Sequence, residues 1–162
     1  MTGTAVYYSF TGSTEVIAKS FSEKSGFKLC KLEDREKRKS APASASILGL
    51  GTALKEPLPD IKNVDFLVLL TPIYAWHPSA QMNTFLKNAG IGGKKLFLVG
   101  VGAGETNEKA MARFSGKVKK LGGQVAGTKA FKGVQLGKNY KEVEAALLKS
   151  GEELAKIIDG LT

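Results

Sequence analysis

The sequence predicts an α/β fold in which a doubly wound, five-stranded parallel sheet lies between two layers of helices. Two observations predict it. Five apolar segments alternate along the chain with amphipathic segments of helical period, the order expected of repeated β-α-β units. Two of the apolar segments, FLVLL (66–70) and LFLVGV (96–101), are almost continuously hydrophobic, as strands covered by helices on both faces are.

The individual elements follow from these periods. The expected strands are 4–9, 27–33, 65–71, 95–101 and 124–131, and the expected helices are 13–25, 78–89, 106–121 and 139–161. Gly26 and the pair Gly122–Gly123 are stop signals after the first and third helices, and Pro78 suits the first turn of the second. Asn139 and Glu142 resemble a capping pair at the start of the fourth.

The stretch 34–63 interrupts the alternation. It begins with the charged run DREKRK, continues through SAPASAS and contains the prolines of EPLP. We expect an irregular insertion here, with a short helix around Ile47–Leu54. A length of 162 residues suits one domain, so we interpret 1–162 as a single domain that carries this insertion.

The net charge of +9 is concentrated in one part of the chain. Twelve lysines and arginines but only two glutamates lie between Lys87 and Lys141, so the remainder of the chain is nearly neutral. This asymmetry favours an acidic partner, a nucleic acid or an anionic surface. A lysine-rich, solvent-facing surface with no specific partner is the alternative.

No segment predicts membrane insertion or export. No apolar run approaches the ~20 residues of a membrane-spanning helix, and MTGTAVYYS lacks the features of a signal peptide. Cys30 is the only cysteine, so a disulfide within the chain is excluded, which agrees with a cytoplasmic location. We expect Cys30 in the core, with a reactive thiol as the alternative. The sequence clusters no metal ligands and no catalytic triad, so we expect neither.

The loop SFTGST (9–14) lies between the first expected strand and the first expected helix. Hydroxyl groups come from Ser9, Thr11, Ser13 and Thr14. Each can donate a hydrogen bond, Gly12 permits a tight turn, and the start of the helix adds free N–H groups. In doubly wound sheets, ligands bind at this edge, beyond the carboxyl ends of the strands. The loop therefore predicts a phosphate site built from neutral donors.

Other phosphate-binding loops do not match. A nucleoside-triphosphate loop needs a second glycine and a lysine, and a dinucleotide fingerprint needs Gly-x-Gly-x-x-Gly. A phospho-receiver domain needs acidic residues after the first strand, which are absent here. One terminal phosphomonoester, bound without a metal, is the best match, and an ordinary Ser/Thr helix cap is the alternative.

Two stretches resemble flavodoxins. SFTGST is similar to their phosphate loop, of Ser/Thr-x-Thr-Gly-x-Thr form, and TPIYAWHPSAQMNTFLKN (71–88) resembles their flavin-facing loop and the helix after it. The resemblance also covers the strand–helix order of nearly the whole chain. It implies a three-layer flavodoxin-like sheet of strand order 2-1-3-4-5, with FMN bound at its carboxyl edge.

The resemblance also implies a set of cofactor-binding residues. The phosphate would be held by Ser9, Thr11, Gly12, Ser13 and Thr14, and the isoalloxazine by Pro72, Ile73, Tyr74, Ala75 and Trp76. In VGVGAGE (99–105), backbone amides of Gly102, Ala103 and Gly104 would approach the polar edge of the ring. Flavodoxins usually have an aromatic residue near that point, and this sequence has none.

Three side chains keep alternative interpretations. Trp76 would stack on the flavin, or else pack in the core or anchor a partner. The ring of Tyr74 would face the flavin or the core. His77, the only histidine, would influence the flavin's charge near neutral pH, or else simply face solvent.

The resemblance implies an FMN-dependent electron carrier rather than a turnover enzyme. Flavodoxins are acidic, whereas this chain is basic, so we expect acidic redox proteins such as ferredoxin-like donors to dock near residues 87–141. A small FMN-dependent NAD(P)H:quinone-type oxidoreductase is the first alternative. A basic binding module without flavin is the second, and nucleic acid is disfavoured because no basic motif rich in aromatic residues is present.

Overall fold

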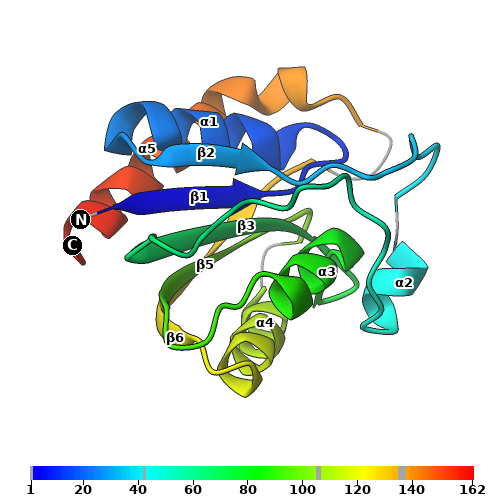
Figure 1. Ribbon diagram of the computed structural model, residues 1–162. Coiled ribbons are helices and arrows are strands. Elements are labelled where there is room, and N and C mark those ends of the chain that lie inside the picture. Colours follow the sequence, from blue (N-terminus) through cyan, green and yellow to red (C-terminus); the bar gives the residue numbers. More distant parts are fainter. Residues whose placement is uncertain (1, 42, 105–106, 135–137) are drawn as a thin grey trace.

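The computed structural model describes residues 2–41, 43–104, 107–134 and 138–162. Figure 1 shows a twisted sheet with α1 (Ser13–Ser25) and α5 (Glu144–Asp159) on one face and α3 (Ala80–Asn88) and α4 (Glu108–Lys120) on the other. The five parallel strands are β1 (Gly3–Tyr7), β2 (Lys28–Lys31), β3 (Phe66–Tyr74), β5 (Lys95–Gly102) and β6 (Gln124–Lys132). Their spatial order is β2-β1-β3-β5-β6, so the predicted order 2-1-3-4-5 of the parallel strands is confirmed.

Two hydrophobic cores, one on each face of the sheet, explain the continuous apolar strands. Leu67 and Leu69 of β3 pack toward α3 and α4, where Phe85 and Phe114 are fully buried. Their neighbour Val68 points the other way, into a core shared with α1 and α5. Because successive residues of a strand point to opposite faces, a strand covered on both sides must be apolar at every position.

The start of the second expected helix is corrected by the structure. Pro78 does not open the helix but belongs to β4 (His77–Pro78), a short strand that the sequence interpretation missed and that pairs antiparallel with the end of β3. Ser79 is the N-cap of α3, and its hydroxyl accepts a hydrogen bond from Met82 N. The predicted cap by Asn139 is present: its side chain accepts from Lys141 N at the start of η1 (Tyr140–Val143), a 3₁₀ helix before α5.

The helix in the insertion is also corrected. It is α2 (Ala43–Ile47) rather than a segment around Ile47–Leu54, because Gly49, with φ of 67°, follows it in a left-handed conformation that ends a helix. Hydrogen bonds attach the insertion to α3: Ala80 N donates to Ser46 Oγ at 2.9 Å, and Thr52 N donates to Thr84 Oγ1 at 2.8 Å.

Two further expectations concern Cys30 and membrane-spanning helices. Cys30 is partly buried on the edge strand β2 and packs against the core, and burial raises the pKa of its thiol, which favours the structural interpretation. Within the described ranges, every helix is too short or too polar to span a bilayer.

Candidate functional site

A cavity of about 400 Å³ opens at the carboxyl edge of the sheet, where the loops after β1, β3, β5 and β6 meet. It is lined by Thr11, Ser13, Thr14, Ala43, Pro72, Ile73, Tyr74, Ala75, Val101, Gly102, Ala103, Gly133 and Val134. The strand order reverses between β1 and β3, so the cavity lies at the switch point at which doubly wound folds bind ligands. Its volume lies within the ~300–1,000 Å³ of small-molecule sites.

The structure brings together most of the predicted site residues. Those that line the cavity are Thr11, Ser13, Thr14, Pro72, Ile73, Tyr74, Ala75, Gly102 and Ala103. Those that do not line it are Ser9, Gly12, Trp76, His77 and Gly104. The neighbouring Glu105 and Thr106, also part of predicted segments, lie outside the described residues.

Four lining residues were not predicted. Gly133 and Val134 follow β6, so the rule that ligands bind beyond the carboxyl ends of strands was sufficient to find them. Val101 lies at the end of β5 and is adjacent to the predicted Gly102. Ala43 comes from α2, and no local pattern in the insertion indicates that this helix closes one side of the cavity.

The loop after β1 leaves the start of α1 open to a ligand. Gly12 is the N-cap, with φ of 105°, and no side chain caps this end. The first intrahelical bond runs from Val16 N to Gly12 O at 3.1 Å, so the N–H groups of residues 13–15 precede it. Ser9 supports the turn from behind, since its Oγ accepts from Gly12 N at 3.1 Å. Free N–H groups and the helix dipole together favour an anion here.

The segment after β6 packs directly on this loop. Val134 N donates to Ser13 Oγ at 3.3 Å, which leaves the hydroxyl hydrogen of Ser13 available for another acceptor. The ring of Tyr140 covers Gly12, because a Cβ atom at position 12 would lie 2.4 Å from Tyr140 Cδ1. Position 12 therefore needs glycine both for its positive φ and for space.

The turn between β3 and β4 holds two residues in an unusual backbone conformation. Ala75 and Trp76 have φ of 46° and 63°, a region that costs roughly 1–2 kcal/mol for each residue that is not glycine. The turn directs Trp76 outward, and its side chain is 52% exposed, with Lys109 Nζ 5.4 Å from the ring centroid. Strained backbone of this kind is concentrated at functional sites.

His77 lies behind this turn and is held in its neutral form. Arg113 Nη1 lies 2.5 Å from His77 Nε2 and donates to it. Burial, followed by the positive charges of Arg113, Lys117 and Lys109, lowers the pKa of His77 below its usual value. At neutral pH the imidazole is therefore an uncharged acceptor beside the cavity rather than a cation inside it.

Tyr74 combines both interpretations left open by the sequence, since it lines the cavity and is also only 7% exposed. Among the described residues its hydroxyl has no hydrogen-bond partner. Burial, and then the charge of Asp34, raise the pKa of this phenol well above its usual range. Asp34 itself accepts from Tyr8 Oη at 2.9 Å and from Gln81 Nε2 at 2.8 Å, a part-buried link between the end of β1 and α3 that the sequence did not indicate.

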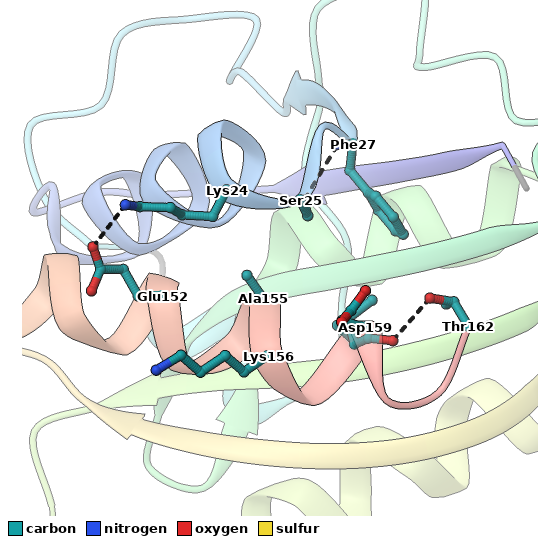
Figure 2. Close-up of a pocket in the computed structure, with 9 residues that line it drawn as sticks. Lys24, Ser25, Phe27, Glu152, Ala155, Lys156, Asp159 and Thr162 are labelled. Atoms are coloured by element: carbon teal, nitrogen blue, oxygen red, sulfur yellow. Dashed lines mark hydrogen bonds and ion pairs between the residues drawn. The ribbon is translucent and has the colours of Figure 1, made fainter.

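A second cavity, of about 420 Å³, lies at the opposite edge of the sheet, between the C-terminal ends of α1 and α5 (Figure 2). Several of its polar groups are bonded within the chain: Lys24 pairs with Glu152 at 3.1 Å, and Thr162 Oγ1 donates to Ile158 O at 3.1 Å. It lies at the amino edge of the sheet, away from the switch point. The described residues contain no group of three or more potential ligands placed to hold a metal ion.

The chain matches no protein-family model and no curated protein sequence. It is similar to the structure of a candidate flavoprotein from Bacteroides uniformis, with a TM-score of 0.73 and 17% identity over 91% of this chain and 97% of that chain. A flavoprotein from Lactobacillus acidophilus, solved in complex with FMN, has a TM-score of 0.69 and 21% identity over 80% of this chain and 92% of that chain. Flavodoxin 1 from Bacillus cereus has a TM-score of 0.56 and 16% identity over 96% of this chain and 98% of that chain. The chain therefore has a flavodoxin-like fold.

Proposed function

We propose that the protein binds FMN in the cavity at the carboxyl edge and carries electrons between redox partners. The observation that carries the proposal is the uncapped start of α1, which opens into the same cavity as three hydroxyl side chains and an apolar slot. The similar flavoprotein from Lactobacillus acidophilus was solved with FMN, which supports the same ligand class here.

The residues present fit the phosphate end of FMN. The hydroxyls of Thr11, Ser13 and Thr14 face the cavity beside the free N–H groups of α1. Neutral donors and a helix dipole suffice to bind a phosphate without lysine or a metal. The Ser13 hydroxyl is already oriented, since Val134 N occupies its lone pair and leaves its hydrogen for the ligand.

The residues on the other side of the cavity fit a planar ring system. Pro72, Ile73 and Ala75 line the cavity together with Val101–Ala103 of the neighbouring strand, where Pro72 pairs with Val101, and most of these side chains are apolar or very small. Such a slot excludes water from a bound ring and lets backbone amides approach its polar edge. When bound, FMN supplies the reversible uptake and release of electrons.

The cavity lining argues against acid–base or nucleophilic catalysis by the protein's own side chains. Of the side chains that line it in the described part of the chain, only Tyr74 is titratable, and its raised pKa keeps the phenol protonated at neutral pH. The cavity thus presents no general base and no activated nucleophile to a substrate. A protein of this kind binds the cofactor, shields it and sets its environment.

The test is to purify the protein, add FMN to any apoprotein, and record the visible absorption spectrum. We expect a flavin spectrum, release of FMN on acid or heat treatment, full reduction by dithionite and no steady consumption of NADH or NADPH with a quinone. Sustained NAD(P)H–quinone turnover would instead identify the oxidoreductase. A protein that cannot be loaded with FMN would refute the proposal.

A further inference from the structure

Four large apolar side chains are exposed beside the mouth of the cavity. Ile47, Leu48 and Leu50, at the end of α2 and in the turn after it, are 46%, 71% and 52% exposed. Trp76 projects from the tip of the turn between β3 and β4, which α2 contacts. The first residue of α2, Ala43, lines the cavity itself, so these side chains lie next to the proposed flavin site.

A row of cations on α4 borders these apolar side chains. Lys109, Arg113 and Lys117 are spaced four residues apart and therefore share one face of the helix. Lys109 lies over the Trp76 ring, and Arg113 Nη1 donates to the Trp76 carbonyl at 3.4 Å. Gly49 lies between the exposed Leu48 and Leu50 in the sequence, and a Cβ atom added at Gly49 would lie 3.6 Å from Lys117 Nζ. We call the combined surface the docking face; it consists of Ile47, Leu48, Leu50, Trp76, Lys109, Arg113 and Lys117.

The positive charge of the docking face is not neutralised by ion pairs. Within the described residues, the cations that form ion pairs are Lys19, Lys24, Lys31, Arg38, Lys55 and Lys129, all elsewhere. The nearest acidic residue in sequence, Glu108, lines a separate hollow against β6 together with Lys129. Lys117 has Lys87 and Arg113 as its charged neighbours.

We propose that the docking face binds an acidic one-electron carrier protein, whose carboxylates surround an apolar centre. This inference rests on the proposed function and names its partner. An apolar centre with a charged rim is the usual anatomy of a protein interface, and exposed tryptophan and arginine are frequent anchors. In each encounter the partner's reduced centre would lose one electron, and an FMN bound in the adjacent cavity would gain it.

The same observations disfavour other occupants. In a two-fold dimer through this face, the row of Lys109, Arg113 and Lys117 would approach its own copy, and like charges would repel. A nucleic acid would satisfy the cations, but its phosphate backbone offers no apolar surface to Leu48 and Leu50. An acidic protein surface with an apolar centre complements both components.

Calorimetric titration with an oxidised plant-type 2Fe–2S ferredoxin, an acidic protein, tests the docking directly. Binding does not require flavin, so the titration is run on the protein both with and without FMN. We expect binding at low salt that weakens at least about tenfold between roughly 20 and 300 mM NaCl. Cytochrome c, a basic redox protein, serves as the opposite-charge control and should not bind. Equal binding of both proteins, or of neither, would overturn the inference.

Matched variants locate the binding surface. Lys109→Gln and Lys149→Gln remove the same charge, but Lys149 is exposed on α5, on the other face of the sheet. We expect roughly a fivefold loss of ferredoxin affinity for the first and little change for the second. Leu48→Ser should weaken binding by a similar factor, whereas Leu161→Ser, 38% exposed near the C-terminus, should not.

The remaining outcomes separate this inference from the proposed function. If FMN does not bind but ferredoxin binds with this salt and variant pattern, the docking face stands and the carrier function fails. If FMN binds and dithionite reduces it but Lys109→Gln and Lys149→Gln behave alike, the docking face is wrong. A sedimentation shift from dimer to monomer on Leu48→Ser would assign the face to a second copy of the chain and also overturn the inference.

Discussion

The starts of α1 and α3 look alike in the sequence but are built in opposite ways. A hydroxyl residue comes shortly before each helix, Thr11 before α1 and Ser79 before α3, and the start of α1 lines the cavity. At α3, Ser79 is fully buried, and its Oγ accepts from Met82 N and, at 3.0 Å, from Thr71 Oγ1. At α1 the N-cap is Gly12, which has no side chain to accept from the helix. One helix satisfies its own donors, whereas the other leaves them for a ligand.

The difference teaches that a hydroxyl residue before a helix does not by itself identify a phosphate site. The residue at the N-cap decides: a serine there binds the helix's free N–H groups itself, while a glycine keeps them free. The hydroxyl residues Ser13 and Thr14, which follow Gly12 at the start of α1, line the cavity. The predictions below alter one start or the other and should separate folding effects from binding effects.

The largest effect is expected from Gly12→Ala. The added Cβ would clash with the Tyr140 ring and would have to adopt φ of 105°, so the loop must move. We expect FMN affinity to fall at least about a hundredfold, because several donors lose their common geometry at once. FMN titration followed by flavin fluorescence measures this loss.

Gly26→Ala is the matched control. Gly26 also has a positive φ, 73°, but nothing lies within 4 Å of a Cβ added there. This change should cost about 1 kcal/mol of unfolding free energy and leave FMN affinity as it is. Unaltered FMN binding by Gly12→Ala would show that the loop does not contact the phosphate.

Thr14→Val should affect binding without affecting folding. The replacement keeps the shape of a buried side chain and removes one hydroxyl that faces the cavity. A hydrogen bond to a charged phosphate contributes about 1.5–3 kcal/mol, so FMN affinity should fall roughly tenfold to a hundredfold. Urea unfolding of the FMN-free protein should give the same free energy as the unaltered protein, and a large loss there would reassign Thr14 to structure.

Ser79→Ala should affect folding without affecting FMN binding. It removes the cap from Met82 N and leaves the buried Thr71 hydroxyl without this partner. We expect the unfolding free energy to fall by about 1–2 kcal/mol, with FMN affinity nearly unchanged. Urea unfolding and FMN titration of the same preparation measure both quantities. A hundredfold loss of FMN affinity without destabilisation would abolish the contrast between the two helix starts.

The smallest effect is a pH dependence from the turn that precedes α3. The folded protein lowers the pKa of His77, chiefly by burial and then through Arg113, so protonation favours the unfolded state. Stability should therefore be unaffected above the unfolded pKa of about 6.5 and should fall as the pH drops below it. The unfolding free energy should decline less between about pH 8 and pH 5 for His77→Gln than for the unaltered protein. Equal declines would show that His77 titrates as in the unfolded chain.

The architecture was predictable because it depends on patterns that the sequence carries directly. The continuously apolar run at 66–70 indicates a strand that is covered by a core on each face. The alternation of strand and helix patterns indicates parallel strands joined by crossover helices, and the topology follows from both. The loop at 9–14 was predictable for the same reason, since Gly12 and the hydroxyl residues are both visible.

What was missed depends on conformations with no local sequence signal. Ala75 and Trp76 adopt positive φ although neither is glycine, so neither the strand β4 nor the outward direction of Trp76 could be foreseen. The place of α2 depends on which glycine ends the helix, and its role at the cavity depends on contacts with β4 that are remote in sequence. The row of cations on α4 becomes a surface only together with Trp76 and the turn after α2, which lie beside it in space.

The most direct test of the central claim is a comparison of FMN with riboflavin, which lacks the phosphate. The apoprotein is titrated with each, and the quenching of flavin fluorescence gives the two dissociation constants. The account predicts that FMN binds at least about a hundredfold more tightly than riboflavin, because the free N–H groups and hydroxyls at the start of α1 contact only the phosphate. It also predicts that Thr14→Val weakens FMN but not riboflavin. Equal affinity for the two flavins would contradict the claim that this loop is a phosphate site.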